Sequence, residues 1–272
     1  MVEEPAENIS GGPESPAQRA AFEPGAAETH AERVVDTLGE LYWQKAYGGR
    51  DAFECLVRTI LSQNTSDKAS QPAHDSLLER YDSDDTAGDT DLVSALADAE
   101  QSKLAETISS AGLYNQKSEV IIDAATEIRA EFDTAADFDA FVKAESPETV
   151  RERLLEIRGV GPKTADCVLL FAGGRGGVFP VDTHVHRIAR RMGLAAADAD
   201  HEEVREALEA AVPAEKCGFG HTAMIQFGRE YCSARKPACL DGPEACPLYD
   251  DCDRVGIDEV AESVVDPAET LD

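Results

Sequence analysis

A tight glycine turn between two helical segments constrains the fold of this chain more than any other feature. Ser146 followed by Pro147 is typical of a helix start, because the hydroxyl can cap the first turn and proline already has a helical φ. The amphipathic segment that follows ends at Gly159-Val160-Gly161, and Pro162 then begins a second helix. Glycines let the backbone turn sharply and leave its N–H groups accessible. The turn is therefore compatible with an anion site and equally with a plain helix–helix connection.

Helical periodicity continues through most of the chain. Apolar residues recur at three- and four-residue spacings in segments that predict helices over Thr29–Gly48, Asp51–Leu61, Leu92–Ile108, Lys117–Phe132 and Phe138–Ala144. The sequence has no convincing alternating strand pattern and no internal repeat of fixed period. We therefore predict an all-α fold in which helices are joined by short loops.

Both ends of the chain and one internal stretch differ in composition from the helical segments. Residues 1–27 lack apolar periodicity and are expected to be a disordered tail, and residues 256–272 are expected to be a solvated acidic tail. Residues 81–91 are predicted to form an acidic loop. Because the sequence has neither a run of about 18 apolar residues nor a secretion-signal pattern, we expect a soluble cytoplasmic protein.

The charge balance is strongly acidic, with 54 acidic and 25 basic residues and a formal net charge of −29. Such a charge repels a polyanion at long range. The partner could be cationic, or the surface could suit a salty cell interior, where a Debye length of about 3 Å in molar salt screens the global field. We favour the second explanation, because the acidic excess is spread along the chain and resembles that of proteins from a salt-loving archaeon.

One region of the sequence departs from this balance. Between Arg151 and Arg191 there are eight basic and four acidic residues, which is a local surplus of +4. A basic region within an acidic protein is typical of a surface that contacts a phosphate backbone. The anion at the glycine turn is therefore predicted to be a nucleic acid phosphate.

Asp182 directly precedes a second amphipathic run, which Gly193 closes. An aspartate at this position predicts the N-cap of a helix. The two histidines of the run, His184 and His186, are two residues apart and lie on different faces of a helix. They are therefore expected to be surface or supporting residues rather than metal ligands.

Two motifs in this region carry a specific resemblance. They are Leu155-x-x-x-Gly159-Val160-Gly161-x-Lys163-Thr164-Ala165 and Val181-Asp182-Thr183-His184-Val185-x-Arg187. Together they resemble the helix–hairpin–helix and Gly/Pro-Asp signature of the endonuclease III family of DNA glycosylases. Further similar stretches are Phe53–Ser62, Gly112–Lys117, Val212–Glu215 and Gly228–Cys239, so the resemblance covers roughly residues 30–255.

The resemblance implies a base-excision enzyme that flips a damaged base out of double-stranded DNA. Lys163 matches the family's catalytic lysine, whose amine attacks C1′ and forms a Schiff base. Asp182 matches the catalytic aspartate, which assists the lysine and stabilises positive charge on the sugar. The implied activity is a bifunctional glycosylase and abasic-site lyase for oxidised pyrimidines. Uracil or mismatched thymine remains an alternative substrate, and a DNA-binding module without catalysis is the alternative from another class.

Several further residues are candidates for contacts with DNA. The hairpin contributes its backbone, and the other candidates are polar, aromatic or basic residues at helix ends and loops. The full set is Gly159, Val160, Gly161, Gln63, Asn64, Leu113, Tyr114, Asn115, Arg187, Arg235 and Lys236. Six of these side chains also have a structural alternative: a capped turn for Gln63 and Asn64, packing for Leu113 and Tyr114, and ordinary surface charge for Arg235 and Lys236.

Four of the seven cysteines lie close together, in the pattern Cys232-x6-Cys239-x6-Cys246-x5-Cys252. Disulfides are not expected inside a cell, and a set of thiolates favours an iron–sulfur cluster or zinc. The Cys-x2–4-Cys pair typical of zinc is absent from the sequence. The resemblance implies a [4Fe–4S] cluster, although the family spacings are six, two and five residues. Gly242-Pro243 favours a turn, so the four extra residues of the middle interval could loop out.

The resemblance also implies a domain organisation. A six-helix barrel that contains the helix–hairpin–helix is expected near residues 52–176. An iron–sulfur cluster lobe is expected from residues 28–51 together with 177–255. The protein is expected to be a monomer associated with the nucleoid, and to bind DNA between its two lobes.

Overall fold

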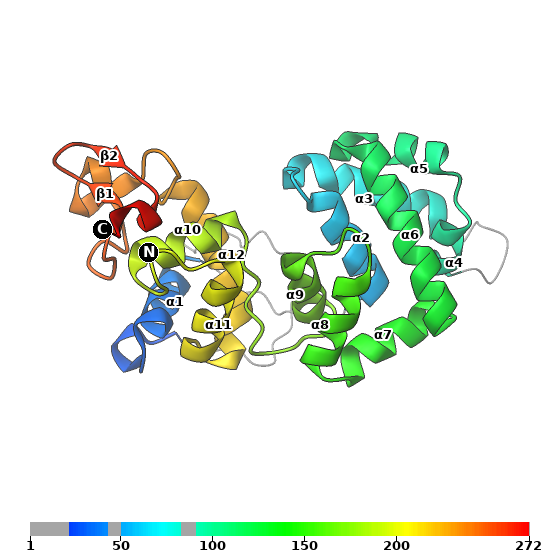
Figure 1. Ribbon diagram of the computed structural model, residues 1–272, viewed down its shortest axis with the longest axis horizontal. Coiled ribbons are helices and arrows are strands. Elements are labelled where there is room, and N and C mark those ends of the chain that lie inside the picture. Colours follow the sequence, from blue (N-terminus) through cyan, green and yellow to red (C-terminus); the bar gives the residue numbers. More distant parts are fainter. Residues whose placement is uncertain (1–21, 43–49, 83–90, 272) are drawn as a thin grey trace, which may run out of the picture. The chain divides into compact units, whose positions relative to one another are not determined.

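The computed structural model describes residues 22–42, 50–82 and 91–271 (Figure 1). The chain divides into two compact units, one of residues 1–47 and 176–272 and the other of residues 48–175. The described residues form twelve α-helices, several 3₁₀ turns and one hairpin of two-residue strands, which confirms the predicted all-α fold. The predicted N-terminal tail lies mostly outside the described residues, and so does the predicted acidic loop at 81–91.

The unit of residues 48–175 consists of helices arranged around α2. Its elements are α2 (Ala52–Ser62), α3 (Asp67–Tyr81), α4 (Leu92–Ala97), α5 (Gln101–Thr107), η2 (Ser109–Ala111), α6 (Tyr114–Phe132), α7 (Ala135–Ala144), α8 (Pro147–Glu156) and α9 (Pro162–Phe171). Helix α2 is buried on most of its faces, including Phe53, Leu56 and Ile60, and it packs against α3, α7 and α9. A helix that is apolar on most of its faces belongs at the centre of a domain.

The predicted single helix over Leu92–Ile108 is wrong in one respect. The helix is interrupted after Ala97, and a short segment separates α4 from α5. In this segment the carboxylate of Asp98 forms an ion pair with Arg129 at 2.9 Å. Both halves pack against α6, which runs beside them in Figure 1. Apolar periodicity alone does not detect this break, because both halves keep their apolar side chains toward the same helix.

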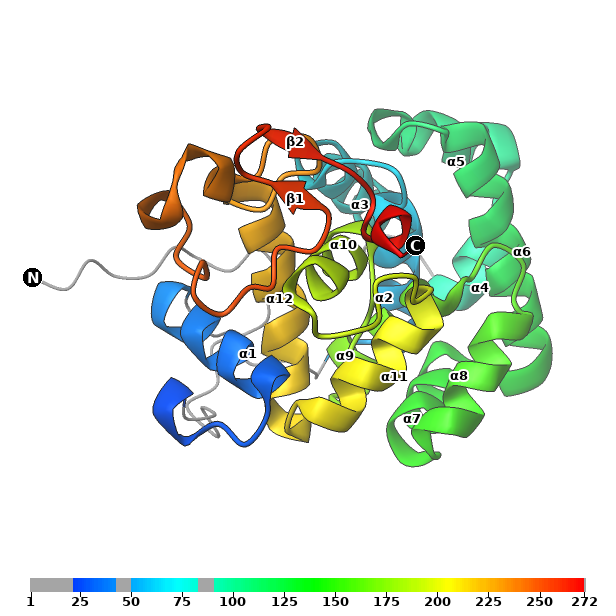
Figure 2. The same ribbon diagram turned by 60° about the vertical axis from the view of Figure 1, so that its left-hand side comes forward.

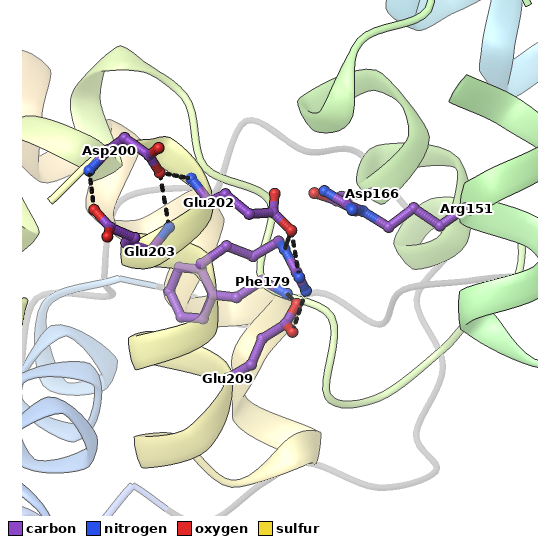
Figure 3. Close-up of polar contacts among 8 residues, drawn as sticks. Arg151, Asp166, Phe179, Asp200, Glu202, Glu203 and Glu209 are labelled. Carbon is purple, nitrogen blue, oxygen red and sulfur yellow. Dashed lines mark hydrogen bonds and ion pairs between the residues drawn. The ribbon is translucent and has the colours of Figure 1, made fainter. Parts of the chain in front are cut away.

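Helices α8 and α9 form the predicted helix–turn–helix. The hydroxyl of Ser146 caps α8 by accepting from Thr149 N, as its position before proline predicts. The two helices pack against each other and are linked by Arg151, whose Nε donates to Asp166 Oδ1 at 2.7 Å (Figure 3). Because Asp166 is only 1% exposed, this ion pair is largely shielded from water, and it joins the two helices.

The second unit is built on four helices and a C-terminal loop region. Its helices are α1 (His30–Leu41), α10 (Thr183–Met192), α11 (His201–Ala211) and α12 (Ala214–Glu230), preceded by the turn η1 (Pro24–Ala26). They enclose one apolar core that includes Val35, Phe179 and Phe219. The buried Lys216 of α12 forms ion pairs with Glu32 and Asp36 of α1 at 2.8 and 2.7 Å.

The segment that leads to α10 is held from α11 (Figure 3). The backbone N–H of Phe179 donates to Glu209 Oε1 at 3.0 Å. Arg205 forms ion pairs with Glu202, one turn before Arg205, and with Glu209, one turn after Arg205. Asp200 caps the helix in a capping box with Glu203. The segment before α10 is therefore held by a hydrogen bond to α11, and α11 itself begins with a capping box.

The C-terminal residues 256–271 are ordered onto the second unit. They form β1 (Ile257–Asp258), β2 (Ser263–Val264) and the turn η5 (Pro267–Thr270), which lie beside α10 in Figure 2. Asp266 forms an ion pair with the buried Arg190 of α10, and Val255 N donates to Arg191 O at 2.9 Å. These contacts differ from the expected solvated acidic tail, because a buried arginine requires a carboxylate from this segment.

None of the described helices combines the length and the apolar character that crossing a membrane would require.

Candidate functional site

Lys163 is the second residue of α9 and directly follows the glycine hairpin. Gly161 is the N-cap of this helix and Pro162 its first residue. Among the described residues, no side chain caps this end by a hydrogen bond. The first N–H groups of a helix have no partner within the helix and carry a partial positive charge. The half-buried Lys163 therefore stands at a helix end that is suited to an anion.

The two glycines of the hairpin are required for different reasons. Gly159 has a φ of 81°, and a Cβ at this position would lie 2.7 Å from Val120 Cγ1 of α6. Gly161 has an ordinary φ of −97°, and a Cβ there would meet no described atom within 4 Å. Packing against α6 and the positive φ require a glycine at position 159. At position 161 neither applies, and the space beside the backbone is open. This open space is what the approach of a phosphate requires.

Two candidate DNA contacts in the same unit occupy exposed positions with left-handed backbone. Asn64 has a φ of 51° and lies just after α2, and Leu113 has a φ of 48° and lies just before α6. Leu113 is 58% exposed and Tyr114 is 40% exposed, and Asn115 is also exposed. An exposed leucine with a left-handed backbone costs free energy without adding to the core. The structural alternative of simple packing therefore does not fit Leu113.

Gln63 differs from its neighbour Asn64. Its amide Nε2 donates to Gly159 O at 3.2 Å and to Thr164 Oγ1 at 3.1 Å. Both acceptors belong to the helix–hairpin–helix, on either side of Lys163. Gln63 thus joins the end of α2 to the hairpin, and the structure brings these two groups of candidate residues together.

The arginines between positions 151 and 191 are engaged within the chain. Arg158 forms ion pairs with Glu119 and Asp123 of α6 at 2.9 and 2.8 Å, and Arg153 pairs with Glu131 at 2.6 Å. The partners of the others are Asp166 for Arg151, backbone carbonyls for Arg175, Arg187 and Arg191, and Asp266 for Arg190. Acidic residues from outside this stretch therefore pair with Arg153, Arg158 and Arg190, so the surplus counted along the sequence is partly neutralised in space.

Asp182 is the N-cap of α10, as predicted. Its Oδ1 accepts from His184 N at 2.8 Å and from Val185 N at 2.9 Å, and the side chain is half-buried. The Nδ1 atom of His184 lies 3.2 Å from Nη2 of Arg187, and the ring of His186 stacks on the ring of His201. A carboxylate with one oxygen fixed by two N–H groups is held in a defined orientation.

Arg187 connects this helix to the cysteine-rich loop. Its Nη2 donates to Cys232 O at 2.9 Å and its Nε donates to the same oxygen at 3.2 Å. Arg235 and Lys236 follow in the loop and are exposed, and Lys236 forms an ion pair with Asp241 at 2.9 Å. In this unit Arg187 is therefore a structural link, while Arg235 and Lys236 point to solvent.

The four clustered cysteines lie in the loop region that follows α12, and none of them forms a disulfide. Cys232 follows α12, Cys239 lies in η3 (Ala238–Asp241), Cys246 follows η4 (Pro243–Ala245), and Cys252 comes after these turns. The long middle interval is taken up by the two 3₁₀ turns, which join at Gly242 with a φ of 115°. The predicted turn at Gly242-Pro243 is thus confirmed.

The clustered thiols combine partial burial with N–H donors to sulfur. Burial is the main cause that raises the pKa of Cys246 to about 11 and that of Cys252 to about 12, with a smaller contribution from the neighbouring cysteines, so without metal these groups stay protonated. Arg191 Nη1 donates to Cys232 Sγ at 3.5 Å, and Arg254 N donates to Cys252 Sγ at 3.4 Å. Thiols in one buried group become thiolates when they bind metal, and N–H donors to sulfur stabilise that state.

Two kinds of metal centre are held by four thiolates. Among the described residues, no three His, Cys, Asp or Glu side chains are arranged to hold a single metal ion. One tetrahedral zinc would draw its sulfurs to about 3.8 Å from each other, given Zn–S bonds of about 2.3 Å. A four-iron cluster takes one thiolate per iron and so places its ligands farther apart. The set of four thiolates therefore suits either kind of centre.

Two residues with a role near the site were missed from the sequence. Lys117 is 4% exposed, and its Nζ donates to Leu61 O, Thr65 Oγ1 and Ala111 O at 2.7, 2.7 and 2.9 Å. A signal was present, because Lys117 lies three residues before the apolar Val120 in the predicted helix over Lys117–Phe132, so both fall on one face of that helix. The role of Thr65 had no such signal, since it depends on contacts between distant segments.

Known proteins with a similar sequence or structure agree with one another. A family model described as the HhH-GPD superfamily of base excision DNA repair proteins matches residues 57–214. Endonuclease III of Thermotoga maritima is 32% identical over 75% of this chain and 83% of its own length. Endonuclease III of Sulfolobus acidocaldarius is 30% identical over 75% and 82%.

Among solved structures, a trapped endonuclease III–DNA covalent intermediate has a TM-score of 0.64 and 26% identity. The alignment covers 81% of this chain and 92% of that chain. A non-covalent endonuclease III–DNA complex gives the same TM-score with 27% identity. These similarities confirm the resemblance that the two motifs indicated. The chain therefore belongs to the HhH-GPD superfamily of base excision DNA repair proteins and is a DNA glycosylase of that superfamily.

Proposed function

We propose that the chain is a bifunctional glycosylase and abasic-site lyase that removes oxidised pyrimidines from double-stranded DNA. The observation that carries this proposal is Lys163, the second residue of a helix whose N-terminus has no side-chain cap within the described residues. A phosphate at this end would hold the DNA backbone close to a nucleophilic amine. A related endonuclease III has been trapped as a covalent intermediate with DNA, which supports the same chemistry here.

The proposed reaction begins at the sugar of the damaged nucleotide. The neutral amine of Lys163 forms a bond to C1′ while the bond from C1′ to the base breaks, and the base leaves with a proton. Opening of the sugar ring gives a Schiff base between Nζ and C1′. Loss of a proton from C2′ then breaks the C3′–O bond, which cuts the strand 3′ to the abasic site. Water finally hydrolyses the imine and restores the lysine.

Asp182 is proposed to stabilise positive charge that develops on the sugar and to assist the lysine. Its orientation supports this role, because Oδ1 is fixed by two backbone N–H groups of α10. An anion held in place before the reaction stabilises a cationic transition state without further reorganisation. Asp182 and Lys163 belong to different units of the chain, so each unit would supply one catalytic residue.

Candidate residues of both units are proposed to contact the DNA. The backbone of Gly159, Val160 and Gly161 would hold a phosphate, and Asn64 and Leu113 would enter the space that the flipped nucleotide leaves. Tyr114, Asn115, Arg235 and Lys236 would add contacts to the backbone or bases. Gln63 and Arg187 would act through the groups that they position, since both are engaged within the chain.

Cys232, Cys239, Cys246 and Cys252 are proposed to hold a [4Fe–4S] cluster. When bound, the cluster would cross-link the loop that carries Arg235 and Lys236, and so contribute folding free energy to it. The test is the iron content of anaerobically purified protein, where about four iron atoms per chain are expected. Cys246→Ser should lower that content and Cys217→Ser should not, because Cys217 is buried in α12. One zinc ion per chain and no iron would overturn the assignment.

The lyase is tested by borohydride trapping on duplexes that carry an oxidised pyrimidine, a uracil, a mismatched thymine or an abasic site. Borohydride reduces the Schiff base, so the protein becomes covalently attached to DNA. The adduct should form with the oxidised pyrimidine and the abasic site, and should disappear in Lys163→Ala. Base release without an adduct would instead indicate a glycosylase without lyase activity. Adducts with uracil alone would reassign the substrate.

A further inference from the structure

Lys117 occupies an unusual environment for a lysine. It is 4% exposed, and its ammonium donates to two backbone carbonyls and one hydroxyl at 2.7–2.9 Å. All three acceptors are uncharged, and burial lowers the pKa of Lys117 below its usual value. Burial of an ammonium costs free energy that neutral acceptors only partly offset. An apolar residue would suit this stripe of α6 better if packing were the only requirement.

The three acceptors come from two loops that are far apart in the sequence. Leu61 and Thr65 belong to the end of α2 and the loop after it, and Ala111 belongs to the turn before α6. Thr65 adds a direct link between these loops, because its hydroxyl also contacts Ala111 O and lies 3.1 Å from Gln63 O. A lysine has three donors in a compact arrangement, which matches three convergent oxygens.

The same network continues to the hairpin. Gln63, whose carbonyl contacts Thr65, donates through its side chain to Gly159 O and Thr164 Oγ1. One hydrogen-bonded chain therefore joins the loop after α2, the turn before α6 and the two sides of Lys163. All these residues lie in the unit of residues 48–175.

The two loops that the network joins carry the exposed residues with left-handed backbone. Asn64 lies between Gln63 and Thr65, and Leu113 lies two residues after Ala111. Such backbone conformations persist only where the surroundings hold them. Lys117 and Thr65 supply this constraint for both loops at once.

We infer that Lys117, through Thr65, is a positioning residue that holds Asn64 and Leu113 as one rigid pair of probes for a lesion in DNA. This inference rests on the proposed function for the target, and on the hydrogen bonds for the coupling. A rigid pair is already in its DNA-bound conformation, so less of the binding free energy is lost in ordering the loops. The resulting gain in binding free energy should be larger for DNA that contains a lesion than for undamaged DNA.

The coupling is tested in the free protein by hydrogen exchange. Lys117→Met keeps the length of the side chain without its donors, and Thr65→Val keeps the shape without the hydroxyl. Each variant should raise amide exchange in residues 62–66 and in residues 111–115 together. Lys103→Met is the matched control, because Lys103 is exposed and pairs only with nearby Glu100 in the described structure. If either variant loosens one loop alone, or neither, the shared role is wrong.

The consequence for recognition is tested by binding. The affinity ratio between a duplex with a tetrahydrofuran abasic-site analogue and an undamaged duplex should fall on the order of tenfold in Lys117→Met, and less in Thr65→Val. A 2-aminopurine opposite the lesion should show a smaller fluorescence change. Affinity for undamaged DNA should stay close to that of the unaltered protein.

The outcomes separate the inference from the proposed function. If Lys117→Met does not fold, as thermal unfolding would show, Thr65→Val decides the question. An unaltered ratio in a folded variant would overturn the positioning role. If the unaltered protein forms no borohydride adduct, the proposed lyase fails, while hydrogen exchange still decides whether the loops are coupled.

Discussion

Helices α9 and α10 begin in opposite ways, although each has a proposed catalytic residue at its N-terminus. Among the described residues α9 has no side-chain cap and starts with Gly161, whereas α10 starts with the carboxylate of Asp182 on two of its N–H groups. Both ends obey the same rule, which is that the first turn of a helix attracts an anion. At α10 the chain supplies the anion itself, and at α9 the place is left open.

This difference indicates which part of the DNA each helix end is expected to contact: the sugar or a phosphate. An end that already carries a carboxylate presents negative charge to its surroundings, which suits a developing cation. An end without one presents N–H groups, which suits a phosphate. The predictions below alter one end at a time, beginning with the largest expected effect.

Asp182→Asn tests whether the cap of α10 also acts in catalysis. Asparagine caps a helix about as well as aspartate, so the fold should be kept while the charge is lost. We expect turnover to fall by about 10²- to 10⁴-fold, with little change in the affinity for DNA. Single-turnover base release and fluorescence anisotropy measure the two quantities. Equal losses in both would show that Asp182 has only a structural role.

Gly159→Ala tests whether the hairpin that presents α9 depends on its first glycine. With a φ of 81° and Val120 Cγ1 only 2.7 Å from the new Cβ, the variant should lose about 1–3 kcal/mol of unfolding free energy. Denaturant unfolding measures this loss. Gly161→Ala is the matched control and should change stability little, since its Cβ meets no described atom within 4 Å. Similar losses in both variants would contradict the distinction between the two glycines.

Gly161→Asp converts the start of α9 into that of α10. The new carboxylate should cap the helix, so stability should stay the same or rise by a few tenths of a kcal/mol. The affinity for DNA should fall about tenfold, because the anion site would be filled and a negative charge added. Anisotropy titrations at fixed salt check this effect. Unchanged affinity would mean that the end of α9 does not meet a phosphate.

The double change Glu119→Gln with Asp123→Asn tests the charge beside the hairpin. It removes both partners of Arg158, which is exposed and pairs with them at 2.9 and 2.8 Å. Exposed pairs contribute at most about 1 kcal/mol, so stability should change little. DNA affinity should rise a few-fold in low salt and the gain should fade as salt increases. A gain that persists in high salt would point to another cause.

The sequence allowed the helix–hairpin–helix, the caps of α8 and α10 and the turn at Gly242-Pro243 to be predicted, because each depends on neighbouring residues. Ser146 and Asp182 cap the helices that follow them, and Gly242-Pro243 forms a turn. The network of Lys117 could not be predicted in the same way. Its acceptors are 6, 52 and 56 residues away along the chain, and only the fold brings them together.

The electrostatic argument from the sequence shows the same limit. Counting charges between Arg151 and Arg191 gave a basic surplus, but Glu119, Glu131 and Asp266 come from outside that stretch and pair with its arginines. Charges that are neighbours in sequence need not be neighbours in space. The hairpin geometry, rather than the charge count, is what supports phosphate binding here.

The pairing of these arginines has a consequence for how the protein finds its target. A protein steered to DNA by exposed positive charge can associate at up to about 10⁸–10⁹ M⁻¹s⁻¹ and then slide along the duplex. With its hairpin arginines neutralised and a net charge of −29, this chain has little such steering. Because this net charge repels DNA at long range, we expect association to be slow at low salt and to become faster as salt screens the repulsion. Search then proceeds by many short collisions. Residence time at a lesion, set by contacts at close range, then determines which sites are repaired.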